Sequence, residues 1–237
     1  ISSGTMAFKG GGKGKGSLEG LPNSSIEGLP RAGVAVFKDS ADKAVDFVER
    51  LREALAPHEA GQVHFENIDV SNVNWPLMSF SLLLDVLQDK SASTTRLKAF
   101  KAGLDDECAV YLAGWLEQLP AESLPSELHL SHNQMTQRGL DTLLDAIEAK
   151  RAELETMALP IWFRLESNKV DMQSSGPIAK ALVEQGRAVL VAKIGDRAPS
   201  NASVALPSFA NKGGGGKGKP AAAPAPAYMA LGGGGGP

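Results

Sequence analysis

Two segments of the chain share one spacing of apolar residues and asparagine, and this spacing limits the folds that the chain can adopt. Both segments follow the pattern L-x-L-x-x-N-x-L, with phenylalanine, methionine or valine at some leucine positions, and they cover residues 128–135 and 163–170. Asn133 and Asn168 are 35 residues apart. A period of about 20–50 residues is typical of chains built from repeated structural units.

A short strand pattern followed by a helix pattern recurs along the chain. Strand patterns begin at residues 34, 63, 97, 128, 163 and 189. The first five precede apolar residues spaced i, i+3, i+4, i+7, which share one helix face. These sets are Ala44, Phe47, Val48 and Leu51; Phe80, Leu83, Leu84 and Leu87; Leu112, Trp115, Leu116 and Leu119; Leu140, Leu143, Leu144 and Ile147; Ala179, Leu182, Val183 and Gly186. Strands separated by helices must run parallel in one sheet.

The segments 128–135 and 163–170 resemble leucine-rich repeats, and the long helical half of each unit is similar to the ribonuclease-inhibitor-like subtype. The resemblance implies an α/β fold: a short curved βα solenoid with a parallel sheet on its concave face and helices on its convex face. In that family the asparagine hydrogen-bonds free backbone groups at the bend after the strand, a role that falls here on Asn133 and Asn168. Ile68 and Ala102 occupy the position in our alignment of the second and third units.

Composition divides the chain into three regions. Eighteen of the 26 glycines lie in residues 1–30 and 211–237, and such segments bury too little apolar surface to fold. We therefore predict a disordered Gly/Lys-rich tail over residues 1–30, a domain of five βα units plus a closing strand over residues 31–195, and a disordered Gly/Ala/Pro/Lys tail over residues 196–237. The predicted domain carries 17 basic and 24 acidic residues, whereas both tails are basic.

The residues that alternate with the core positions of each strand are expected to face solvent. Aligned across the units they form columns that contain histidines, basic residues, carboxylates and aromatic residues. The resemblance implies that this face binds a protein partner, and the predicted partner-binding residues are His64, Glu66, Lys98, Phe100, His129, Ser131, Trp162, Arg164 and Glu166, with Phe37 in the same column as Phe100. Trp162 and Phe100 could anchor an interface. Alternatively, Trp162 covers the flank of the core and Phe100 fills a bend.

A second hypothesis is that the chain is associated with RNA. The lysines of the tails stand among glycines, and together with the basic strand column they could hold a phosphate backbone. These lysines are Lys9, Lys13, Lys15, Lys212, Lys217 and Lys219. The alternative is that both tails are linkers.

The sequence predicts no catalytic site, no metal site, no cofactor and no small-molecule substrate. His129 and His132 are three residues apart, so on a strand they face opposite sides. Asp105, Asp106 and Glu107 are expected to cap a helix, and Cys108 to pack in the core. A single cysteine, the lack of a long apolar run and the lack of a secretory signal predict an intracellular protein, cytoplasmic or nuclear, with no membrane partner.

Overall fold

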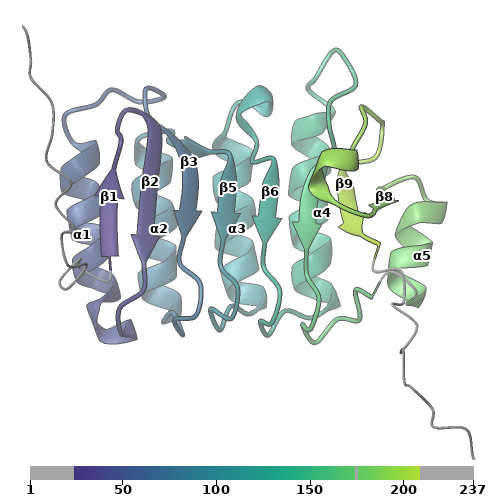
Figure 1. The fold of residues 1–237 in the computed structure, drawn as a ribbon, viewed down its shortest axis with the longest axis horizontal. Coiled ribbons are helices and arrows are strands. Elements are labelled where there is room, and N and C mark those ends of the chain that lie inside the picture. The colour runs from purple at the N-terminus through teal and green to yellow at the C-terminus, as the bar shows by residue number, and fades with distance from the viewer. Residues whose placement is uncertain (1–23, 174–175, 209–237) are drawn as a thin grey trace, which may run out of the picture.

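A mixed α/β fold with one largely parallel sheet is confirmed by the computed structural model, which describes residues 24–173 and 176–208 (Figure 1). The strands are β1 (Ser24–Glu27), β2 (Arg31–Phe37), β3 (His64–Asp69), β4 (Ser93–Thr94), β5 (Arg96–Lys98), β6 (Glu127–His129), β7 (Ile161–Arg164), β8 (Ala188–Val191) and β9 (Val204–Pro207). The helices are α1 (Ala44–Leu55), α2 (Leu77–Asp89), α3 (Asp106–Gln118), α4 (Gln137–Arg151) and α5 (Pro177–Glu184).

The sheet is open and runs in the order β1-β2-β3-β5-β6-β7-β9-β8, with β4 also beside β3. All neighbours are parallel except β1 and β2. Helices α1 to α4 lie behind one face of the sheet, and most of the other face is uncovered (Figure 1). We call this second face the open face.

The core lies between the sheet and the helices, as the helical spacing predicts. All four residues of each predicted set on α1, α2, α3 and α4 are buried, and they pack with the inward strand residues in one cluster. On α5 only Ala179 and Leu182 are buried, because this shorter helix ends at Glu184 and leaves Val183 37% exposed. Burial of these apolar faces is the main force that holds each helix on the sheet.

One turn is repeated at the carboxyl ends of four strand segments. Asn72, Lys101, His132 and Ser167 each adopt a left-handed backbone conformation, with φ of 64°, 50°, 62° and 59°. Three of them follow a residue, namely Phe100, Ser131 or Glu166, whose carbonyl oxygen continues the parallel ladder beyond the regular strand. Asn72 N donates to Phe100 O, Lys101 N donates to Ser131 O, and His132 N donates to Glu166 O. The same backbone geometry therefore ends each of these strands and leads toward the next helix.

The two asparagines of the motif hydrogen-bond the backbone just after this turn. Asn133 is 3% exposed, and its Oδ1 accepts from Ala102 N and Leu104 N. Its Nδ2 donates to Ala99 O and Leu130 O. Asn168 repeats the arrangement one unit later, because its Oδ1 accepts from Met135 N and its Nδ2 donates to Leu130 O and Leu165 O. Each amide therefore joins two neighbouring units.

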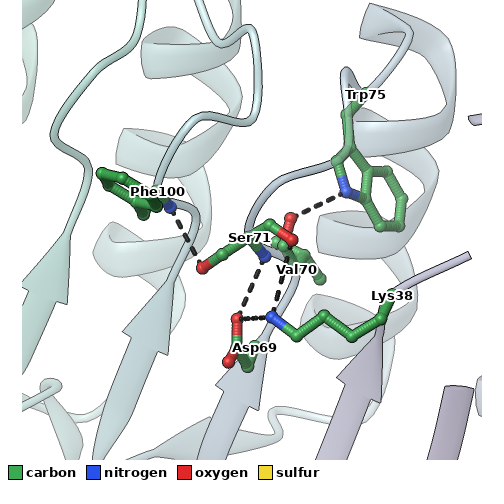
Figure 2. Close-up of polar contacts among 6 residues, drawn as sticks. All are labelled: Lys38, Asp69, Val70, Ser71, Trp75 and Phe100. Atoms are coloured by element: carbon green, nitrogen blue, oxygen red, sulfur yellow. Dashed lines mark hydrogen bonds and ion pairs between the residues drawn. The ribbon is translucent and has the colours of Figure 1, made fainter. Parts of the chain in front are cut away.

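The predicted register of the second unit is wrong by five residues. Ile68, not Val63, pairs with Leu97, so the motif of this unit runs from Ile68 to Trp75. Trp75 takes the place that Met135 holds in a later unit; it is 3% exposed, and its Nε1 donates to Val70 O at 3.1 Å (Figure 2). The error arose because apolar residues recur on both sides of Glu66 and Asn67, where the strand pattern is interrupted.

The predicted boundaries at residues 30 and 195 are also wrong. Strand β1 lies inside the predicted first tail, where it pairs with β2 and packs Ile26 against the core. Strand β9 lies inside the predicted second tail, and it separates the predicted closing strand β8 from β7. Its residues Val204, Ala205 and Leu206 are buried, which shows that a run of four residues can supply a central strand. Residues 1–23 and 209–237 lie outside the described part.

We expect Asn133→Ala to lower the free energy of unfolding by about 2–4 kcal/mol, because it leaves four buried backbone groups without their partner. Chemical denaturation followed by circular dichroism would measure the loss. Gln134→Ala is the matched control, since the side chain of Gln134 is exposed and its removal should change stability by less than about 0.5 kcal/mol. Equal stability of the two variants would contradict this role of Asn133.

Candidate functional site

A row of polar side chains crosses the open face from one strand to the next. The strand register places Val36 beside Asp69, Asp69 beside Lys98, Lys98 beside His129, and His129 beside Arg164. These residues alternate with buried core residues, so their side chains point away from the helices. The parallel register thus brings together charged groups from four units that are far apart in the sequence.

The first part of this row is held by an ion pair. Lys38 Nζ lies 2.6 Å from Asp69 Oδ1, and Ser71 N donates to the same oxygen at 3.0 Å (Figure 2). Burial opposes ionisation of Asp69, but the ammonium of Lys38 and the bonds from Ser71 outweigh it, so the pKa of Asp69 lies below its ordinary value. Ser71 Oγ in turn accepts from Phe100 N at 3.2 Å, which connects the ion pair to the next unit.

Phe100 lies at the centre of a cluster at the carboxyl ends of the strands, and the cluster consists of Phe100, Lys101, His129 and His132. The ring centroid of Phe100 lies 5.4 Å from that of His129 and 4.9 Å from that of His132. Lys101 Nζ lies 5.5 Å from the same centroid, within the range of a cation–π contact. Phe100 and His129 are half-buried, whereas Lys101 and His132 are exposed. We call these four residues the Phe100 cluster.

His129 is the most strongly perturbed group of the open face. Its burial and the positive charges of Arg164 and Lys98 disfavour the imidazolium and lower the pKa of His129 to about 4. Its Nε2 lies 2.9 Å from Ser131 Oγ. At neutral pH the ring is therefore uncharged, and it can share a hydrogen bond with Ser131 while it packs at a 40° tilt against Phe100.

The far end of the row is held by Arg164 and Glu166. Arg164 Nε lies 3.3 Å from Glu166 Oε1. The second oxygen, Glu166 Oε2, is buried and has no hydrogen-bond partner among residues 24–173 and 176–208. An ionised carboxylate can accept several hydrogen bonds, so Glu166 retains unused acceptor capacity at the edge of the Phe100 cluster.

Five of the nine predicted partner-binding residues lie together on the open face: Lys98, Phe100, His129, Arg164 and Glu166. Ser131 is only 1% exposed, so it can support His129 but cannot itself meet a partner. The predicted place of Phe37, on the exposed face in the column of Phe100, is also wrong. Phe37 is 1% exposed and packs on Phe47 and Trp75 in the core.

The interface interpretation requires an exposed Trp162, but only 8% of this residue is exposed. The segment between β8 and β9, which contains the short helix Ile194–Asp196, passes in front of the sheet beside β7 (Figure 1). Arg197 of this segment donates to Ser126 O and Pro160 O and so fixes it there. The burial of Trp162 therefore argues against its use as an exposed anchor for a partner.

His64 and Glu66 do not lie in the predicted columns, because of the five-residue error in the second unit. His64 sits at the start of β3, and its two ring nitrogens lie 2.8 Å from Ser93 Oγ and Thr95 Oγ1. Asp69 and Ser71 take the expected places of His64 and Glu66 beside Lys98 and Phe100. The correct columns would have followed from aligning Ile68 and Val70, rather than Val63 and Phe65, with the third unit.

The remaining sequence candidates have structural roles or lie outside the described residues. Asp105 caps its own helix by accepting from Glu107 N and Cys108 N, and Asp106 accepts from Thr136 and Gly139 at the start of α4. Burial raises the pKa of the Cys108 thiol to about 11. The tail lysines proposed for RNA, namely Lys9, Lys13, Lys15, Lys212, Lys217 and Lys219, all lie outside the described part of the chain.

Comparisons of the chain with protein-family models and with curated proteins found no match. Within residues 24–173 and 176–208, no group of three or more His, Cys, Asp or Glu side chains could hold a metal ion. The same residues include no helix long and apolar enough to cross a bilayer. The open face and the Phe100 cluster are therefore the candidate functional site.

We expect the stability of the fold to decrease as the pH falls from about 6.5 to about 4, in part because of His129. In this range the unfolded chain binds a proton that the folded His129 does not, so acid favours unfolding. His129→Gln should remove roughly 1–2 kcal/mol of this dependence, a value reduced for partial solvent screening. Denaturation of both proteins at pH 4 and 7 measures it.

A direct control is the proton NMR titration of the His129 ring in the folded protein. A midpoint near pH 4 would agree with the cationic surroundings of His129. A midpoint near 6.5, or parallel stability curves for wild type and variant, would contradict them.

Proposed function

We propose that this chain is a leucine-rich-repeat-like solenoid that binds a protein partner on its open, concave sheet face and catalyses no reaction. Three features support the repeat assignment: the shared motif of segments 128–135 and 163–170, the left-handed residue repeated at four strand ends, and the amide bridges of Asn133 and Asn168. Solenoids bury their apolar surface between neighbouring units and leave one extended face for binding.

The observation that carries the binding proposal is the Phe100 cluster within a row of charged groups. A half-buried aromatic ring flanked by two imidazoles and an ammonium offers apolar area and electrostatic contacts at one place. Aromatic and arginine side chains are the residue types that dominate interface energies. Phe100 therefore replaces Trp162 as the proposed central anchor, with Arg164 beside His129 in the same row.

The charges of this face suggest which groups the partner presents. Lys98 and Lys101 form no salt bridge with any described residue, whereas Asp69 and Glu166 are already paired with Lys38 and Arg164. A partner that places an acceptor against the two lysines would complete the row. Such complementarity would select the partner and its orientation more than it would raise the affinity.

A catalytic use of the His129–Ser131 pair is less well supported. A nucleophilic serine needs an accessible hydroxyl, a base with a suitable pKa and a group that orients the base. Ser131 is 1% exposed, and the pKa of His129 is about 4, so the imidazole is a weak base. The neighbours of His129 in its row are Lys98 and Arg164, which are cations and not carboxylates. This arrangement favours a binding role for the face.

The test is affinity capture from a native lysate with the full chain, followed by measurement of Kd for the partner obtained. Phe100→Ala should weaken binding by about tenfold or more, which corresponds to ~1–3 kcal/mol for an interface anchor. Arg164→Glu should weaken it further by reversing a charge. Because Arg164→Glu places a second carboxylate beside Glu166, circular dichroism must show that this variant is folded before its binding is compared.

Tyr111→Ala is the matched control, because Tyr111 is an aromatic residue of α3 on the helical side and is 43% exposed. It should bind the partner as the wild type does. Capture that survives in the folded Phe100→Ala and Arg164→Glu variants would contradict the proposed surface. Capture that is abolished by nuclease would instead support the RNA hypothesis.

A further inference from the structure

A second candidate site lies at the amino-terminal ends of β6 and β7, the opposite end of these strands from the Phe100 cluster. It is a cavity of about 300 Å³ between the loop that precedes β6, the loop between α4 and β7, and the segment after β8. Its apolar walls include Leu124, Leu154, Leu159 and Ile161. Leu159 is 49% exposed, so the apolar lining continues to the surface. A cavity of this size can hold a small molecule.

Two guanidinium groups line the same cavity. Arg151, the last residue of α4, donates from Nη1 to Leu159 O at 2.9 Å and from Nη2 to Ala158 O and Ser200 O, both at 3.1 Å. Arg197 donates from Nε to Ile194 O at 2.9 Å and from Nη1 to Ser126 O and Pro160 O at 2.7 and 2.8 Å. These contacts hold three loops together around the cavity.

Two arginines but only one carboxylate, that of the exposed Glu122, line this cavity, so positive charge is in excess there. All six hydrogen bonds end on backbone carbonyl oxygens, and neither guanidinium forms a salt bridge within the described part of the chain. Burial lowers the pKa of both residues, and for Arg197 only the charge of Glu127 opposes this effect. A guanidinium has five N–H donors, so three contacts leave two on each arginine.

We propose that this cavity binds a small amphiphilic carboxylate, with the carboxylate at Arg151 and Arg197 and the hydrocarbon against the leucines. The N–H groups that remain are Nε–H and one Nη1–H of Arg151 and both Nη2–H of Arg197, and these can donate charge-assisted hydrogen bonds to carboxylate oxygens. An anion at this place would compensate two partly desolvated cations, and a hydrocarbon chain would cover the leucines that line the opening. A fully polar anion would gain the first interaction without the second.

This inference does not depend on the protein-binding proposal. The cavity lies at the other end of the strands and shares no residue with the Phe100 cluster. The sequence offered no sign of it, because Arg197 stands in a region that we predicted to be a tail and Arg151 is the ordinary basic residue of a helix end. Only the loops, brought together in space, place the two arginines on one cavity.

The test is titration of the full chain with octanoate, 1-octanol and octylamine at constant ionic strength, monitored by calorimetry. Octanoate should bind saturably with a Kd of about 0.1–1 mM, a range typical of a ligand of this size. The alcohol, which has the same chain without the charge, should bind at least tenfold more weakly, and the amine should not bind. Equal binding of octanoate and 1-octanol would overturn the proposal.

Leu159→Glu is the decisive variant, because it introduces a negative charge at the opening without removing a buried side chain. It should weaken octanoate binding at least tenfold with an unchanged thermal midpoint. Met157→Glu is the matched control; Met157 is 61% exposed in the same loop but does not line this cavity, so binding should persist. Arg197→Gln should also abolish binding, although it removes contacts between loops and can lower stability. Octanoate binding that is absent in the wild type or unchanged in Leu159→Glu would overturn the proposal.

Discussion

The amide of Asn133 makes the bonds on which the centre of this structure depends. Where a strand ends in a tight left-handed turn, the backbone N–H and C=O groups that follow lose their ladder partners while still inside the core. Asn133 supplies two acceptor and two donor contacts to these groups, and Asn168 supplies a similar set one unit later. The apolar faces of the helices can then close over the bends without leaving unpaired polar groups.

The repeated turn also determines what the open face can present. Because Lys101 and His132 occupy the same left-handed position in neighbouring units, their side chains leave the backbone at corresponding points, and both reach the ring of Phe100. The parallel pairing of β5 with β6 brings the ring of His129 to the same place. Two neighbouring βα units contribute two side chains each to the cluster, and the pairing of β5 with β6 brings them into contact. This is the physical basis of the proposed binding face.

The two ends of the strands differ in chemistry because different kinds of backbone meet there. At the carboxyl ends, short uniform turns place side chains in regular columns. At the amino ends, irregular loops converge, and two arginines join their carbonyl oxygens around a cavity. The segment that carries Arg197 also leads into β9, so one stretch of about a dozen residues shapes the cavity and completes the sheet.

The sequence by itself determined the parallel α/β architecture, the four buried helix faces and the place of the core, because apolar periodicity reports directly on which side of an element is buried. It also identified Lys98, Phe100, His129 and Arg164 as neighbours on the open face, since Leu97 and Leu128 define the register there. Only the tertiary structure decided the register of β3, the exposure of Trp162, the insertion of β9 and the meeting of Arg151 with Arg197. Each of these depends on contacts between segments distant in sequence, and local patterns carry no information about which segment will cover or pair with another.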